Sequence, residues 1–320
     1  MTTRRAAIIG AGNVGATVAF TLINTGLVEE LSLIDINSAK AEGEALDLQD
    51  GVSFLRPARI HWGGYEQCRG AQVIIITAGA NQKPGQSRME LLEQNAAVFK
   101  QIVPAVLEYN DQAVIIVVTN PVDPLTYLAM DLANLRAGQV IGSGTVLDTA
   151  RLRNQISLHC RIDPRNIHAY VIGGHGEGAV PVWSAAQIAG LRLEQFCRFC
   201  GKGCAARTAI DRRVFDAADR IIKLKGATFY SVSLAVARIV QSILADENSV
   251  LTVTTLVDDY YGINGVCLSL PAVLGHRGIK EVLPLELAAD EIQSLQYAAG
   301  TLKEGQLRIS RPGRLAPAPS

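Results

Sequence analysis

The first half of the chain alternates short apolar runs with stretches of helical periodicity. The apolar runs are continuous rather than alternating, which favours parallel strands that are covered on both faces. A helix is expected around Val14, Val18 and Leu22, ending at Gly26, and another over residues 89–109. Such strand–helix–strand units predict a right-handed, parallel α/β sheet. Its strands are expected at residues 6–9, 31–36, 59–62, 73–78, 113–119 and 140–141.

The pattern changes near residue 143. Beyond it, a Gly-rich loop at residues 173–178 interrupts a series of helical stretches. The change predicts two domains, residues 1–143 and 144–320, without a flexible linker between them. The Pro-rich end, residues 311–320, is expected to be poorly ordered. In the second domain we expect helices over residues 148–160, 207–223, 231–244 and 284–304, and an antiparallel strand over residues 249–257.

Composition narrows the class of protein. The 320 residues are 48% hydrophobic but only 5% aromatic, so Ala, Val, Ile and Leu must build the core. Lys plus Arg equals Asp plus Glu at 30 each, which leaves no net field to attract nucleic acid or an anionic membrane. The first strand follows the start at once, leaving no room for a signal peptide, and no apolar run approaches the ~20 residues that span a bilayer. We expect a soluble, cytoplasmic protein.

Six cysteines are too few for a disulfide framework in a chain of this length. Three of them, Cys197, Cys200 and Cys204, lie close together in the sequence. A zinc site would need a fourth ligand at suitable spacing, and the neighbouring residues offer none. We therefore interpret the cluster as reduced thiols on or beside a helix, and we expect no metal.

A dinucleotide-binding pattern precedes the first helix. Residues 10–15 read GAGNVG, and Asp35 follows twenty residues after Gly15, at the end of the second strand. The glycines permit a tight turn and a close approach to a pyrophosphate, which the helix N-terminus also attracts. A carboxylate at Asp35 suits the adenosine ribose and repels a 2′-phosphate, so NAD is predicted rather than NADP. The alternative is an ordinary strand-to-helix turn. The candidate cofactor residues are Gly10, Gly12, Asn13, Val14, Gly15, Asp35 and Asn120.

The remaining candidates suit the reduction of a ketone, which needs a proton donor, a cation near the carbonyl oxygen and an anchor for the substrate. His175 lies among small residues in the Gly-rich loop, and histidine has a pKa near neutrality. Asp148 and Arg151 are three residues apart on a helix, so they share a face. There the carboxylate can orient a histidine and the guanidinium can bind a carboxylate. Arg88 ends a polar loop, residues 79–88, that can close as a lid.

Each candidate also has a simpler interpretation. The histidine can be an ordinary loop residue, the Asp148–Arg151 pair an ion pair on a solvated helix face, and Arg88 a residue that begins a helix. Asn120 follows the fifth strand at the ligand-binding edge, where its amide can bind a ribose or substrate hydroxyl or form an Asx turn.

These segments together resemble the lactate/malate dehydrogenase family over residues 5–308. The motifs that carry the resemblance are GAGNVG, LIDI, AGANQKPGQSR, TNPVD, GSGTVLDTARLR, HAYVIGGHGEG and KGAT. The resemblance implies a Rossmann-type doubly wound parallel sheet followed by an α+β substrate domain, and an NAD-dependent hydride transfer to a 2-oxo acid. It also implies roles for residues: proton transfer by His175, orientation of His175 by Asp148, binding of the substrate carboxylate by Arg151, polarisation of the carbonyl by Arg88, and pocket lining by Asn120 and Thr228.

The resemblance bears on the substrate as well. In this family the position of Gln82 reads the far end of the substrate, where malate-specific members carry an arginine. A neutral Gln82 beside a methyl group leaves no unpaired charge in a closed pocket, so we expect pyruvate and L-lactate. Lys83, and the departures at Gly174, Glu177 and Gly178 from the usual lactate pattern, keep oxaloacetate and malate as the alternative.

Two further positions suggest regulation. Arg153 and His168 match the positions through which bacterial members of the family bind fructose 1,6-bisphosphate at a subunit interface, and both side chains suit a phosphate group. The alternative is a solvated helix residue and a residue at the start of a strand. The family also implies a homo-oligomer, a tetramer or at least a dimer. A protein of another class, a non-catalytic NAD-binding module, remains the rival, although such a module has no need of a proton donor.

Overall fold

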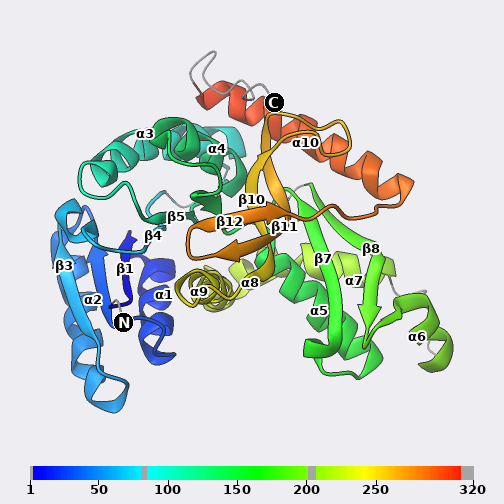
Figure 1. Ribbon diagram of the computed structural model, residues 1–320, viewed down its shortest axis with the longest axis horizontal. Coiled ribbons are helices and arrows are strands. Elements are labelled where there is room, and N and C mark those ends of the chain that lie inside the picture. Colours follow the sequence, from blue (N-terminus) through cyan, green and yellow to red (C-terminus); the bar gives the residue numbers. More distant parts are fainter. Residues whose placement is uncertain (1–2, 81–84, 177, 201–206, 311–320) are drawn as a thin grey trace.

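The computed structural model describes residues 3–80, 85–176, 178–200 and 207–310. Its first half is a sheet of parallel strands in the order β3-β2-β1-β4-β5-β6 (Figure 1). This is the doubly wound order: β1 is central, β2 and β3 extend the sheet to one side, and the chain then crosses back to add β4, β5 and β6 on the other. The expected α/β fold is therefore confirmed. The strands are β1 (Arg5–Ile9), β2 (Glu30–Ile34), β3 (Arg59–Gly63), β4 (Val73–Ile76), β5 (Val114–Val117) and β6 (Val140–Gly142).

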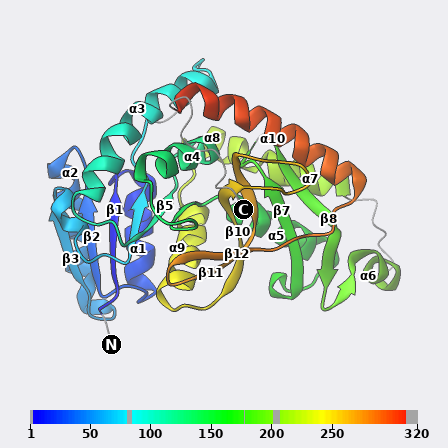
Figure 2. The same cartoon turned by 45° about the horizontal axis from the view of Figure 1, so that its top comes forward.

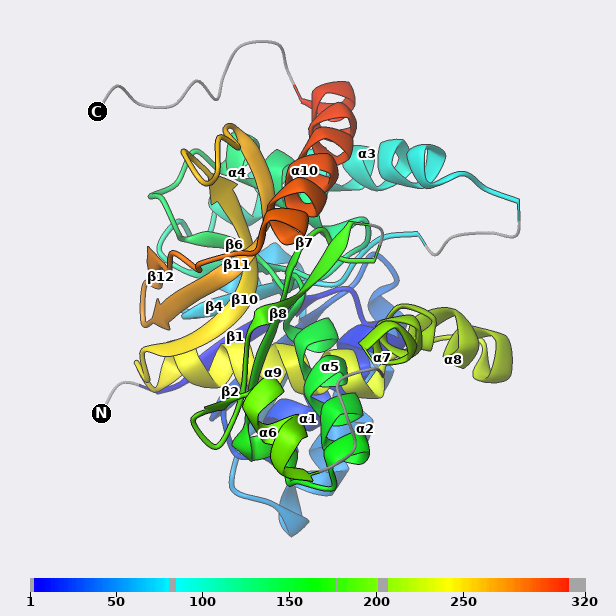
Figure 3. The ribbon, with the colours of Figure 1, turned by 90° about the vertical axis from the view of Figure 1, so that its right-hand side faces the viewer.

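Both faces of this sheet are covered, which explains the continuous apolar runs. Successive residues of one strand enter different cores: Ile75 packs in the core under α1 and α9, and Ile76 in the core under α3 and α4. Figure 3 shows α9 alongside α1, on the first of these faces. The helices concerned are α1 (Asn13–Asn24), α2 (Ser38–Gly51), α3 (Arg88–Leu107), α4 (Val122–Ala133) and α9 (Tyr230–Leu244).

The second half continues the same sheet with antiparallel strands. The order beyond β6 is β10-β11-β7-β8-β9, with β12 paired to β11, and one residue pair, Thr254 with Gly142, joins the halves. Gly142 is required there because a Cβ would lie 2.5 Å from the Thr126 hydroxyl and 2.7 Å from the Cβ of Thr254. The strands are β7 (Ile167–Gly173), β8 (Ala179–Ile188), β9 (Leu191–Arg192), β10 (Ser249–Val257), β11 (Val266–Gly275) and β12 (Gly278–Val282).

Helices of the second half confirm two predictions and correct two others. The expected helices over residues 148–160 and 231–244 are present as α5 (Val146–Cys160) and α9. The helix expected over residues 207–223 is instead two helices, α7 (Arg207–Phe215) and α8 (Ala217–Lys225). Ile210 and Val214 are buried in α7, whereas α8 has no buried residue, so the break lets the chain leave the core. The remaining short helix is α6 (Leu193–Cys200).

The last helix, α10 (Ala289–Ile309), begins and ends five residues later than the predicted span of 284–304. The residues before it are extended because their backbone N–H groups bind tyrosine hydroxyls: Leu285 donates to Tyr260 and Leu287 to Tyr261. Glu291 then accepts the Ala288 N–H and starts the helix. Figure 2 shows α10 running from the α3–α4 side to β7 and β8, so it ties the two halves together.

In the part of the chain that the structure describes, no helix combines the length and apolar character that a membrane crossing requires. Several residues singled out from the sequence lie outside the described ranges, namely Gln82, Lys83, Glu177, Cys204 and the Pro-rich end at residues 311–320.

Candidate active site

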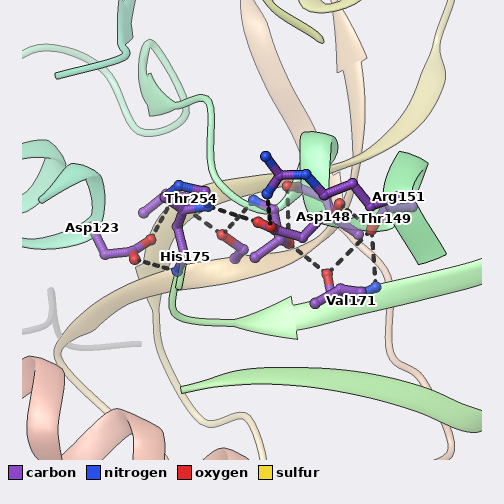
Figure 4. Close-up of polar contacts among 10 residues, drawn as sticks. Asp123, Asp148, Thr149, Arg151, Val171, His175 and Thr254 are labelled. Carbon is purple, nitrogen blue, oxygen red and sulfur yellow. Dashed lines mark hydrogen bonds and ion pairs between the residues drawn. The ribbon is translucent and has the colours of Figure 1, made fainter. Parts of the chain in front are cut away.

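A buried carboxylate joins the two predicted catalytic segments. Asp148 lies in the first turn of α5, and His175 lies in the loop between β7 and β8. The Nδ1 atom of His175 is 2.7 Å from Oδ2 of Asp148, and Nη1 of Arg151 donates to Oδ1 of the same carboxylate at 3.1 Å (Figure 4). Only 7% of the Asp148 side chain is exposed. The three residues predicted to act together do therefore meet, and the ion pair is not on a solvated helix face.

The pair with Asp148 controls the protonation of His175. Burial disfavours the charged imidazole, but the negative charge and hydrogen bond of Asp148 more than offset it, so the pKa of His175 is raised above its usual 6.5. Asp123 adds to this effect and Arg151 opposes it. Burial likewise disfavours the charged Asp148, yet His175 and Arg151 lower its pKa. The site thus favours an imidazolium beside a carboxylate more than an isolated pair of these side chains would.

Asp123 is a functional residue that the sequence analysis missed. It lies in the first turn of α4, is 2% exposed, and accepts the backbone N–H of His175 at 2.8 Å and the hydroxyl of Thr254 at 2.6 Å. Burial raises its pKa, although these hydrogen bonds oppose the rise. Removing the carboxylate would leave the His175 N–H without its acceptor, at about 1–3 kcal/mol, whereas the Thr254 hydroxyl also lies 3.2 Å from that of Ser269. Its signal was an acid in the first turn of a mostly apolar helix, in the TNPVD segment.

Arg88 begins α3 and reaches the histidine loop. Ser87 and Glu90 form a capping box at this helix start, which fixes where the helix begins. A Cβ on Gly176, the residue after His175, would lie 3.9 Å from Nη2 of Arg88. The guanidinium therefore lies next to the histidine loop, as a residue that polarises a carbonyl there must.

A second missed residue, Asn95, supports the opposite side of the site. Its amide is fully buried in α3, accepts the N–H of Ala80 at 2.7 Å and donates to the carbonyl of Asn120 at 2.7 Å. It thereby joins the start of the predicted lid to the segment after β5. The Asn120 side chain is exposed at this edge. Thr228, between α8 and α9, is half-buried, and among the described residues no hydrogen bond links it to the histidine.

The predicted cofactor turn has the geometry that a dinucleotide needs. Gly10 has a φ of +104°, and a Cβ there would lie 2.6 Å from the backbone nitrogen of Ala78. A Cβ on Gly15 would lie 1.8 Å from the carbonyl oxygen of Gly10. These two glycines are required by the protein's own packing. Gly12 is not, because nothing lies within 4 Å of a Cβ there. Its open surface leaves room for the ligand backbone contact that the pattern predicts.

The N-terminus of α1 is also free of competing groups. Gly12 provides no side-chain cap, and the first turn, which includes Asn13 and Val14, contains no acidic residue. Asp35 lies beside the turn and accepts the N–H of Ala11 at 2.7 Å and that of Asn37 at 2.9 Å. An uncapped helix start with a carboxylate next to it fits the pyrophosphate and the adenosine ribose of NAD.

Of the two predicted effector residues, Arg153 on α5 contacts the two residues of β7 that follow His168. Arg153 donates from Nε to the carbonyl of Ala169 at 3.0 Å, and its guanidinium lies over the ring of Tyr170, 5.5 Å from the centroid. His168 is exposed one residue away. Cys197 is buried in an apolar cluster with Phe196 and Val214, and no group of metal-binding side chains is present among the residues that the structure describes.

Comparisons with known proteins agree with this geometry. The lactate/malate dehydrogenase NAD-binding domain matches residues 4–142, and the lactate/malate dehydrogenase alpha/beta C-terminal domain matches residues 145–308. The chain is 47% identical over 304 residues to the L-lactate dehydrogenase of Acetivibrio thermocellus, covering 94% of this chain and 96% of that protein. It is 48% identical over 298 residues to the L-lactate dehydrogenase of a Thermoanaerobacter species, covering 92% and 96%.

Solved structures give the same result. A lactate dehydrogenase enzyme from a Medee basin deep-sea metagenome library superposes with a TM-score of 0.94 at 37% identity, covering 97% of this chain and all of that one. The minor L-lactate dehydrogenase of Enterococcus mundtii also gives a TM-score of 0.94, at 36% identity, covering 97% of this chain and 99% of that one.

The geometry makes a direct prediction for Asp148→Asn. Loss of the negative charge 2.7 Å from Nδ1 leaves burial as the largest effect on the imidazole, so the pKa of His175 should fall. We expect a fall of about 1–3 pH units, measured by NMR titration of labelled imidazole. Asp163→Asn, which neutralises an exposed carboxylate paired with Arg165, is the matched control and should leave the His175 titration unchanged. An unchanged titration in Asp148→Asn would show that this carboxylate does not hold the proton on His175.

Proposed function

The chain belongs to the lactate/malate dehydrogenase family and is an NAD-dependent oxidoreductase, and we propose that it interconverts pyruvate and L-lactate. The observation that carries the proposal is the buried Asp148 carboxylate between His175 and Arg151, since it combines a proton donor with an anchor for a substrate carboxylate. The similarity to the L-lactate dehydrogenases of Acetivibrio thermocellus and a Thermoanaerobacter species supports the choice of substrate.

The proton is assigned to one nitrogen of His175. Asp148 binds Nδ1, so Nε2 is the ring nitrogen that faces the substrate and gives its proton to the carbonyl oxygen. Asp148 stays ionised because its pKa is lowered, and its negative charge stabilises the imidazolium. NADH, when bound, supplies the hydride that the carbonyl carbon receives. In the reverse direction, neutral His175 takes the proton from the hydroxyl of lactate.

Two arginines have separate tasks in the proposal. Arg151 is 14% exposed, and its guanidinium shares Asp148 through a single nitrogen, which leaves the others to bind the substrate carboxylate. Arg88, which lies beside Gly176, polarises the carbonyl oxygen. Asn120 and Thr228 complete the pocket wall. The cofactor is assigned to residues 10–15 and Asp35, with Asn120 at the nicotinamide end.

The choice of pyruvate over oxaloacetate is assigned to Gln82. An amide there matches a methyl group, whereas an arginine would pair with a second carboxylate. Oxaloacetate reduction is the second candidate, because Lys83 offers a cation for a second carboxylate and the GGHG form at residues 173–176, with Gly174, resembles malate members of the family.

The proposal extends to regulation by an effector and to assembly into an oligomer. Arg153 and His168 are assigned to bind one phosphate group, and a two-fold axis would bring a second pair toward the other phosphate of fructose 1,6-bisphosphate. We assign the protein to the cytoplasm, as a homo-oligomer of two or four subunits, with a domain boundary near residue 143. The effector role requires the oligomer.

His175→Asn separates an enzyme from a mere cofactor-binding module. Asparagine keeps a polar group but cannot give a proton at neutral pH, so pyruvate reduction should fall by about 10² to 10⁴. NADH binding should stay within a few-fold of wild type, since the cofactor is assigned to the turn at residues 10–15 and to Asp35, whereas His175 lies in the loop between β7 and β8. Turnover and NADH fluorescence titrations measure the two effects. Retained turnover would remove His175 from the chemistry, and no turnover in the wild-type protein with any 2-oxo acid would favour the module.

Substrate preference tests the role of Gln82. We expect a higher kcat/KM for pyruvate than for oxaloacetate, by about 10²-fold or more, because a second carboxylate would be buried without a partner. Gln82→Arg should reverse the order, and Gln86→Arg, at the described end of the same loop, is the control that should not. Fructose 1,6-bisphosphate should lower the KM for pyruvate. No effect of the bisphosphate across a range of pH would end the regulatory proposal, and an initial preference for oxaloacetate would make this a malate dehydrogenase.

A further inference from the structure

The backbone of Val171 in β7 forms hydrogen bonds with side chains of α5 and its N-cap, where a neighbouring strand would normally provide the partners. Val171 faces Pro181 of β8, a residue without an N–H, and on the other side of β7 the neighbouring strand β11 pairs only at Gly173. The polar groups of Val171 turn to α5 instead. Its N–H donates to the Thr149 hydroxyl at 2.9 Å, and its carbonyl accepts from the Thr145 hydroxyl (Figure 4 shows the Thr149–Val171 contact).

Both threonines lie on one face of α5. They are four residues apart, and both are buried, with Thr145 0% and Thr149 6% exposed. Water therefore has no access to replace either hydroxyl. Thr149 is further fixed by the hydroxyl of Thr252, 3.0 Å away on β10. The two hydroxyls supply Val171 with the acceptor and the donor that a neighbouring strand would provide.

Thr145 makes this contact instead of a more local one. It is the N-cap residue of α5, where a threonine hydroxyl usually accepts an N–H of the first turn and stabilises the helix by about 1 kcal/mol. No such cap bond is formed here. The hydroxyl binds Val171 instead, so the position serves the alignment of α5 with β7 rather than the stability of the helix end.

The contact between Thr149 and Val171 lies close in sequence to Asp148 on one segment and to His175 on the other. Thr149 follows Asp148 directly on α5, and Val171 is four residues before His175 on the segment that leads into its loop. A shift of α5 along β7 would change the 2.7 Å separation of Asp148 and His175.

We propose that Thr149 and Thr145 are positioning residues, which clamp Val171 between them and so set the separation between the Asp148 carboxylate and the His175 imidazole. Their effect on turnover rests on the proposed function, but their effect on the imidazole does not. The charged groups that face His175 are Asp148 and Arg151 from α5, Asp123 from α4 and, beside Gly176, Arg88 from α3. Of these, only the two from α5 would move with the clamp.

The test compares Thr149→Val, which keeps the shape but loses the hydroxyl, with Thr149→Ser, which keeps the hydroxyl. In Thr149→Val the N–H of Val171 is left unpaired, α5 shifts, and kcat/KM for pyruvate should fall about ten- to a hundredfold. The pKa of His175 should fall by about half to one pH unit in NMR titration, as the bond to Asp148 weakens. Thr149→Ser should restore both to within about threefold and a few tenths of a pH unit.

The control variants test whether Thr149 affects the pKa of His175 through the position of Asp148. Thr21→Val removes a buried hydroxyl from the middle of α1 and should change neither quantity. In an Asp148→Asn background, Thr149→Val should cause no further fall in the pKa of His175, because the carboxylate it positions is gone. Thr145→Val carries the same expectations as Thr149→Val and replaces it should that variant not fold.

The outcomes are distinct. A folded Thr149→Val with an unchanged pKa of His175 overturns the clamp, whatever its turnover. An equal fall in the Asp148→Asn background also overturns it, because the threonine would then act by another route. A changed pKa in a protein that does not reduce pyruvate would support the clamp and contradict the proposed function instead.

Discussion

The structure depends on keeping one buried carboxylate charged. Asp148 can remain ionised with so little exposure only because His175 and Arg151 lie on either side of it. That requirement draws together a helix and a loop that are far apart in sequence. It also affects each partner, since Asp148, against the effect of burial, raises the pKa of the histidine and binds the arginine through one guanidinium nitrogen.

The contact between the two halves of the chain also involves His175. Asp123, from the cofactor half, binds the backbone of His175 and the hydroxyl of Thr254, which itself pairs with Gly142 across this contact. The helix α10 spans both halves on the outside. The position of the imidazole is therefore fixed from the cofactor half as well as from α5.

Much of this could be read from the sequence, for physical reasons that also explain the failures. Strands covered on both faces and the glycines of residues 10–15 leave strong local signals, and the spacing of Asp148 and Arg151 reveals a shared helix face. Asp123 and Asn95 escaped notice because their partners are distant in the sequence. Asp123 binds the backbone of His175 and the hydroxyl of Thr254, and Asn95 binds backbone groups of Ala80 and Asn120. The division of α7 from α8 depends on which residues are buried, and the late start of α10 depends on hydrogen bonds to the hydroxyls of Tyr260 and Tyr261. Local periodicity records neither.

The most direct test of the account is the pH dependence of kcat/KM for pyruvate reduction, set beside the titration of His175 in the same protein. Reduction needs the protonated imidazole, so the rate should fall as pH rises through the raised pKa of His175. In Asp148→Asn this fall should move to lower pH by the same amount as the NMR titration. A rate profile that stays in place while the titration moves would show that the proton comes from another group.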